Sequence, residues 1–170
     1  MKAVILHGYM PGNLNEDEKD TIIQVEQISH ALGNLGYEPQ IIPFSLDLKK
    51  TMEDLAEASP SFVFNLVESV EGKSNLAFLA PHLLDHLKIP YTGNTSNALF
   101  LTSDKILTKK VLTSFGVPTP YWVSEGDLNN AELYSLVENV PYIIKMAKEH
   151  SSIGLDDSSV IRNVSILKSE

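Results

Sequence analysis

Short apolar runs in the first part of the chain predict β-strands. Each run is bounded by polar or turn-forming residues, and the four runs occupy residues 3–6, 40–44, 62–67 and 89–92. The third run is apolar enough to be a strand that is buried on both faces, which is typical of parallel sheets. The strands therefore favour a buried, parallel arrangement.

Between these runs, apolar residues recur at helical spacing. The clearest series predicts a helix that Asn15 is placed to cap and Gly36 to end. Its members are Ile22, Val25, Ile28, Leu32 and Leu35. A shorter series around Leu55 predicts a helix that ends before Pro60, and a leucine-rich series predicts a third helix over residues 76–87. The alternation predicts an α/β fold, with an open parallel, Rossmann-like sheet, flanking helices and right-handed crossovers.

The pattern changes after residue 94, and we place a domain boundary near residues 94–100. The second part is predicted to contain mixed elements. Its predicted helices cover residues 103–115 and 131–138, and its predicted strands cover residues 142–146 and 159–161.

The carboxyl ends of the predicted parallel strands form the edge at which such sheets bind ligands. The residues at these ends are His7-Gly8, Glu68-Ser69 and Thr92-Gly93-Asn94. A lone histidine such as His7 is more often a hydrogen-bonded structural residue than a catalyst, since no Ser or Cys nucleophile accompanies it in a recognisable pattern. His82 and His86 lie four residues apart, but no third ligand motif supports a zinc site, which favours a helix surface.

Composition excludes several classes of protein. The chain carries 22 Asp and Glu residues against 13 Lys and Arg residues, a formal charge of −9. This balance argues against nucleic-acid binding, whose affinity comes mainly from basic side chains. The absence of cysteine excludes disulfides and thiolate chemistry. No apolar run approaches the roughly 20 residues that cross a bilayer, and the first residues do not form a signal peptide. We expect a cytoplasmic protein without membrane or nucleic-acid partners.

Four short segments carry a resemblance to a known family. They are I-P-Y-T-G-N at 89–94, S-D-K-I-L-T-K at 103–109, G-V-P-T-P at 116–120, and I-K followed by S-S-I-G at 144–154. In order and spacing they resemble the D-alanine–D-alanine ligases of the ATP-grasp family. The resemblance covers residues 61–161 well and residues 1–60 in outline.

The resemblance implies a domain plan and an activity. Residues 1–95 would form the pre-ATP-grasp substrate domain, and residues 96–170 part of the α+β ATP-grasp central domain, with the C-terminal catalytic domain absent. The intact enzyme would be an ATP-dependent carboxylate–amine ligase of peptidoglycan biosynthesis that joins D-alanine or a related amino acid through an acyl phosphate. It would use ATP and Mg²⁺ and pair as a homodimer through the first domain. We expect this portion alone to be inactive and to bind neither ATP nor Mg²⁺.

The resemblance also assigns roles to individual residues. Lys105 and Lys145 match positions that face the ATP phosphates as point charges. The loop residues Ser151, Ser152 and Gly154 would bring backbone N–H groups close to phosphate oxygens, and Ser151 would also contact substrate. Glu16, Asp17 or Glu18 could stand where the family's glutamate contacts the substrate ammonium group. Glu68 is a candidate for the same group because it follows a predicted strand at the ligand-binding edge, and a role at a helix N-terminus or in a salt bridge is an equal alternative. No catalytic or metal-binding residue is assigned.

The sequence departs from the family pattern at several of these positions. Met146 replaces the proline that follows the strand lysine, and His150 replaces a glycine before the two serines. Glu68-Ser69 stands where well-known members have His-Gly, and the first loop lacks the motif G-G-x-S-x-E. Substrate identity is therefore less defined than family membership.

Three interpretations of function remain open. Besides the ligase, the chain could be a non-catalytic small-molecule or protein-binding module derived from one. It could also be a Rossmann-like nucleotide- or sugar-binding protein with unrelated chemistry, an interpretation favoured only if Lys105 and Lys145 lie far apart. As alternatives to the ATP roles, Lys145 could be a lysine at a strand end that reaches into solvent, and Lys105 a solvated lysine in the first turn of a helix.

Overall fold

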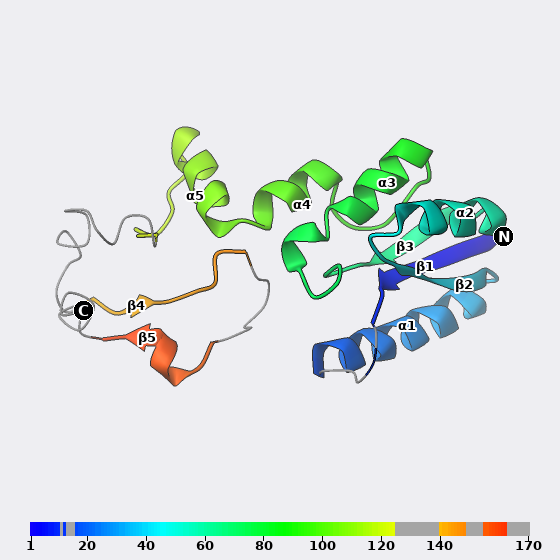
Figure 1. Cartoon of the computed structure of the whole chain (residues 1–170), viewed down its shortest axis with the longest axis horizontal. Helices are drawn as coiled ribbons and strands as arrows, with labels where there is room; N and C mark the ends of the chain where they lie inside the picture. Colours follow the sequence, from blue (N-terminus) through cyan, green and yellow to red (C-terminus); the bar gives the residue numbers. More distant parts are fainter. Residues whose placement is uncertain (11, 13–15, 125–139, 149–154, 163–170) are drawn as a thin grey trace. The chain divides into compact units, whose positions relative to one another are not determined.

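The computed structural model describes residues 1–10, 12, 16–124, 140–148 and 155–162 (Figure 1). By its internal contacts the chain divides into two units, Met1–Leu101 and Thr102–Glu170. Each unit is described below by itself.

A three-stranded parallel sheet forms the centre of Met1–Leu101. Its strands are β1 (Lys2–Gly8), β2 (Glu38–Phe44) and β3 (Phe62–Leu66), in the order β2-β1-β3. Ala3 pairs with Pro39 of β2 and with Phe62 of β3. Helix α1 (Glu16–Asn34) connects β1 to β2, and α2 (Leu48–Ala58) connects β2 to β3. The predicted parallel sheet with flanking helices is confirmed.

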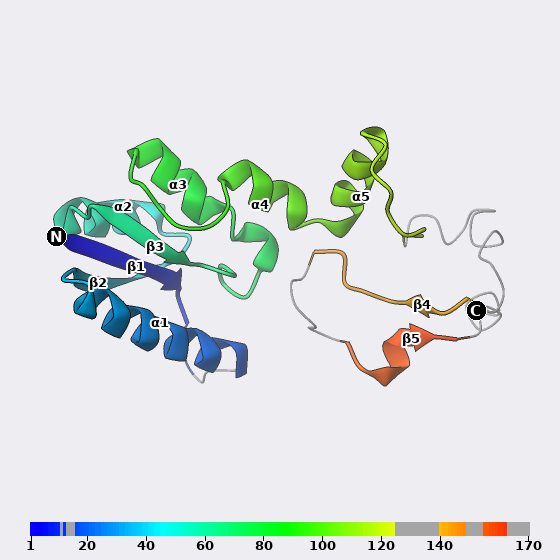
Figure 2. The ribbon, with the colours of Figure 1, turned by 180° about the vertical axis from the view of Figure 1, so that it is seen from behind.

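Helices cover both faces of this sheet, as the two views show (Figures 1 and 2). Val4 and Leu6 of β1 belong to a buried cluster with residues of α2 and of α3 (Leu79–Leu87). Ala3 and Ile5 belong to a second cluster with residues of α1. Because successive side chains of a strand point to opposite faces and both faces are covered, β1 is apolar from Ala3 to Leu6, and these four residues have no exposed surface.

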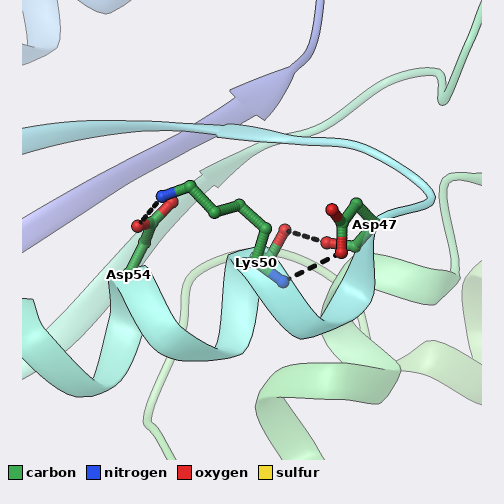
Figure 3. Close-up of polar contacts among 4 residues, drawn as sticks. Asp47, Lys50 and Asp54 are labelled. Carbon is green, nitrogen blue, oxygen red and sulfur yellow. Dashed lines mark hydrogen bonds and ion pairs between the residues drawn. The ribbon is translucent and has the colours of Figure 1, made fainter.

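Local signals set the ends of the helices. Gly36 has a φ of 82°, and Tyr37 N donates to Leu32 O at 3.0 Å, which is the glycine-terminated ending that the sequence predicts for α1. At the start of α2, Lys50 N donates to the Asp47 carboxylate at 3.0 Å, while the Lys50 ammonium pairs with Asp54 (Figure 3).

The predicted fourth strand, residues 89–92, is wrong. Only an isolated parallel bridge joins Val63 to Tyr91. Val63 N donates to Pro90 O, and Thr92 N donates to Val63 O. Pro90 has no N–H to extend the ladder, and the next donor, Asn65 N, bonds to the hydroxyl of Thr92 instead of to its backbone.

The leucine-rich helix begins later than predicted. Residues Ser74–Leu76 form the 3₁₀ turn η1, and α3 begins at Leu79. Pro81 then lies in the first turn of α3, where its missing N–H is not needed; a helix from residue 76 would have required that N–H. A further helix, α4 (Ser96–Thr102), occupies the segment where we expected only a boundary.

Thr102–Glu170 contains α5 (Lys105–Ser114) and an antiparallel pair, β4 (Tyr142–Ile143) and β5 (Val160–Ile161), preceded by the 3₁₀ turn η4 (Asp157–Ser159). The helix predicted over residues 103–115 and the strand predicted over residues 159–161 are confirmed as α5 and β5. The strand predicted over residues 142–146 is shorter. After β4, the carbonyl groups of Met146 and Ala147 accept hydrogen bonds from Lys105 of α5. The helix predicted at 131–138 lies outside the described residues.

Candidate functional site

The carboxyl edge of the parallel sheet contains a close approach between two backbones. A Cβ atom built on Gly8, at the end of β1, would lie 2.6 Å from the carbonyl oxygen of Ser69, in the segment after β3. Real Cβ atoms do not approach an oxygen so closely, so position 8 requires glycine for packing. The contact fixes the end of β1 against the loop that carries Glu68.

That loop is itself well anchored. Val67 and Val70 are buried. Val70 and Lys73 exchange two backbone hydrogen bonds around Glu71 and Gly72. Both turn residues have positive φ, 50° and 71°, as a type I′ turn requires. Glu68 is exposed on this anchored segment.

His7 is the last side chain of the central strand before Gly8. Its ring is half-buried, and Nδ1 lies 2.9 Å from the Gly8 carbonyl oxygen. Burial lowers the pKa of His7 below the ordinary value of 6.5, and the bond to Gly8 raises it by less. The imidazole is therefore neutral at pH 7.

Glu16 and Asp17 lie in the first turn of α1, which runs back along the sheet from the end at which β1 finishes (Figure 1). The placement of their side chains lies outside the described part of the chain. Their positions put two acidic residues near the edge that His7 occupies, but their contacts stay a prediction.

A second candidate site lies in Thr102–Glu170, at the start of α5. The Asp104 carboxylate caps the helix by accepting from Ile106 N and Leu107 N, both at 2.9 Å. Lys105 N donates to Ala147 O, and the Lys105 ammonium donates to Met146 O, each at 2.9 Å. The first turn of α5 is thereby joined to the residues that follow Lys145.

This contact bears on the predicted pair of lysines. Lys145 is exposed and directly precedes Met146, whose carbonyl holds the Lys105 ammonium. The structure thus brings Lys105 to the segment that carries Lys145, which argues against the Rossmann-like interpretation that needed the two residues far apart. Ser151, Ser152 and Gly154 lie outside the described residues.

Sequence reasoning left Lys109 without a role. The Lys109 ammonium donates to the Thr119 hydroxyl at 2.9 Å and to the Pro120 carbonyl at 2.8 Å. It joins α5 to the G-V-P-T-P turn, which is a structural task. Lys109 and the G-V-P-T-P turn both belong to segments that carry the family resemblance. This shared membership was the sequence signal that could have indicated their contact.

Asp156, which lies shortly before β5, has a local structural task. The Asp156 carboxylate accepts from Ser158 and caps η4 together with Ser159. These hydrogen bonds, that of the Ser158 hydroxyl first, lower the pKa of Asp156. Within the ranges that the structure describes, no three His, Cys, Asp or Glu side chains are grouped to hold a metal ion, and no helix is long and apolar enough to cross a membrane.

Comparisons with known proteins agree with this architecture. The D-alanine–D-alanine ligase of Aquifex aeolicus is 33% identical over 159 residues, which cover 91% of this chain and 50% of the relative. The enzyme of Moorella thermoacetica is 32% identical over 163 residues, which cover 91% of this chain and 49% of the relative. No family model matches the chain.

Solved structures show the same fold. The D-alanine–D-alanine ligase from Bacillus anthracis complexed with ATP superposes with a TM-score of 0.69 at 23% identity, over 99% of this chain and 53% of that one. The chain spans about half the length of the curated relatives it matches. On this similarity in sequence, the chain is a homologue of D-alanine–D-alanine ligases over about half of their length, and it has the same fold.

Proposed function

We propose that the chain is the N-terminal portion of an ATP-dependent carboxylate–amine ligase, which joins D-alanine or a related amino acid through an acyl phosphate. The relatives bear the name of this activity, and one structural neighbour was solved with ATP. In this proposal Met1–Leu101 binds the amino acid at the carboxyl edge of its sheet, and Thr102–Glu170 supplies cations for the nucleotide phosphates.

The observation that carries the proposal is the contact of Lys105 with Met146 and Ala147. It joins two segments that are far apart in sequence and that each carry a lysine. Both side chains are cationic, and cations on two joined segments suit an anionic ligand bound at those segments. Triphosphate oxygens are such a ligand, and ATP fits this donor set.

The substrate side of the proposal rests on the loop after β3. Glu68 is exposed on a segment anchored by Val67, Val70 and the contact between Gly8 and Ser69. A carboxylate on a fixed backbone can bind an ammonium group with little loss of conformational entropy. Glu16 and Asp17 are proposed to act on the same group.

Titration of the chain with millimolar ATP and Mg²⁺, followed by NMR, tests the nucleotide site. The sequence alone led us to expect no binding, but α5 and residues 146–147 already meet, so we now propose weak binding. Lys145→Ala should weaken it about tenfold, because a hydrogen bond to a charged group contributes roughly 1.5–3 kcal/mol. Lys105→Ala should weaken it by a similar factor.

Lys49→Ala provides the matched control, since Lys49 is an exposed lysine of α2 in the other unit. Equal affinity in wild type, Lys145→Ala and Lys49→Ala would contradict the proposed roles of the lysines. A folded chain that binds D-alanine but no nucleotide would favour the non-catalytic binding module instead.

A further inference from the structure

His7 stands at the carboxyl end of the central strand, between Pro43 of β2 and Leu66 of β3. By the two-residue period of β1 it shares a face with Ala3 and Ile5, which belong to the cluster with α1. Where these two positions are apolar and fully buried, the third is an imidazole at the ligand-binding edge. Hydrophobic packing alone does not account for a histidine there.

The hydrogen bond to Gly8 determines which ring nitrogen carries the proton. A carbonyl oxygen only accepts, so the Nδ1 atom at 2.9 Å must be the N–H donor. The neutral ring then carries its lone pair on Nε2. His7 is held in the tautomer that offers a hydrogen-bond acceptor.

The charge state suits a positively charged partner. Burial lowers the pKa of His7, which keeps the ring neutral at pH 7. A charged imidazolium would repel an ammonium group and would have no acceptor to offer it. A neutral ring with a fixed Nε2 lone pair can accept one of the ammonium hydrogens.

The backbone around His7 is fixed from two sides. The Gly8 backbone packs against the Ser69 carbonyl, and Tyr9 N donates to Phe44 O at 2.8 Å. The Gly8 carbonyl that orients the ring is therefore itself held in place. The same contact joins this strand end to the loop of Glu68, so an acceptor and a carboxylate belong to joined backbone segments.

We propose that His7 binds the ammonium group of the amino-acid substrate by accepting a hydrogen bond at Nε2. The inference rests on the proposed function, since it takes an amino acid as the ligand of this edge. It adds a binding residue that neither the family resemblance nor the motifs of the sequence assign.

Two variants separate the two ring nitrogens. In His7→Asn, the side-chain amide can replace the Nδ1 donor to Gly8, but nothing replaces Nε2. In His7→Gln, the longer side chain can place an oxygen near the position of Nε2. His86→Asn serves as the matched control, because His86 is exposed on the last turn of α3. Circular dichroism establishes that each variant is folded.

The first measurement is the affinity of the wild-type chain and of each variant for D-alanine. The second is NMR of labelled histidine rings in the wild-type chain. We expect D-alanine to shift the His7 Nε2 resonance and propionate, which lacks the ammonium group, to leave it unchanged. His7→Asn should weaken D-alanine binding about tenfold or more, as for loss of a hydrogen bond to a charged group. His7→Gln should restore part of the affinity, and His86→Asn should match wild type.

Unchanged D-alanine affinity in folded His7→Asn would overturn the inference, as would an equal Nε2 shift with propionate. Absence of any D-alanine binding to the wild-type chain would overturn it too. Nucleotide titration of the same His7→Asn sample distinguishes the two proposals. If ATP still binds and binding still depends on Lys145, the proposed function is supported even where the inference about His7 is overturned.

Discussion

The two units differ in how they hold their apolar side chains. In Met1–Leu101, two clusters on opposite faces of the sheet include residues with no exposed surface, among them Leu6 and Phe44. In the described part of Thr102–Glu170, the buried side chain is that of Ser103, and Phe115 is 80% exposed. Burial of apolar area stabilises the first unit, whereas the described residues of the second are joined mainly by hydrogen bonds. We infer that packing organises the first unit, and that helix capping and other hydrogen bonds organise the second.

The strongest test of this contrast between the two units is a matched pair of phenylalanine substitutions. Phe44→Ala should cost about 3–5 kcal/mol of unfolding free energy, because it opens a cavity in a closed core. Phe115→Ala should cost less than about 0.5 kcal/mol, as for an exposed side chain. Urea unfolding followed by far-UV circular dichroism measures both, and similar losses would refute the contrast.

Gly8 and Gly33 provide a second pair, within the first unit. A Cβ at position 8 would meet the Ser69 carbonyl, whereas one at position 33, in α1, would meet nothing within 4 Å. Gly8→Ala should destabilise by about 1–3 kcal/mol through overpacking, and Gly33→Ala should stabilise by about 0.5–1 kcal/mol through helix propensity. Thermal melts of the two variants should shift in opposite directions; a shift in the same direction would contradict the close approach at Gly8.

The second unit should respond to loss of a cap. Asp104→Ala removes the acceptor for two backbone N–H groups of α5, at a cost of about 1 kcal/mol. Hydrogen exchange of the α5 amides should accelerate roughly fivefold, while the β1 amides stay unchanged. Asp104→Ser, which keeps a capping oxygen, should retain most of the protection. Equal acceleration in both variants would show that the cap is not the cause.

The smallest expected effect is a pH dependence from His7. Because the pKa of His7 is lower in the folded chain than its ordinary 6.5, protonation favours the unfolded state. The unfolding free energy of the wild type should therefore fall relative to that of His7→Asn as the pH falls below about 6.5. Above that pH, the difference between the two should stay constant. Paired denaturation curves across this range measure the difference, and a difference that is constant with pH would contradict the lowered pKa.

Much of the first unit could be predicted because its signals are local. Gly36 ends α1 through a backbone conformation that glycine readily adopts, and the apolar run of β1 requires two covered faces. The failure at residues 89–92 has a non-local cause, since it depends on which partner Asn65 N finds in the folded chain. Pro90 was the sequence signal against a strand there, because proline cannot donate a ladder hydrogen bond. The β-propensity of the neighbouring residues did not compensate for it.

The candidate sites were predicted unevenly for the same reason. The family motif indicated Lys105 and Lys145, but no pattern indicated that the Met146 carbonyl would hold the Lys105 ammonium. The fixed tautomer of His7 was equally hidden, because it depends on the placement of Gly8 O relative to the ring. Residue types at strand ends were visible in the sequence, whereas their hydrogen-bond partners required the fold.

Hydrogen exchange of the wild-type chain with and without ATP and Mg²⁺ tests the central claim most directly. That claim is that the start of α5 and residues 145–147 bind nucleotide phosphates. The account predicts added protection in the first turn of α5 and at residues 145–148, with β1 unchanged. Protection that appears only in Met1–Leu101, or nowhere in either unit at saturating nucleotide, would contradict it.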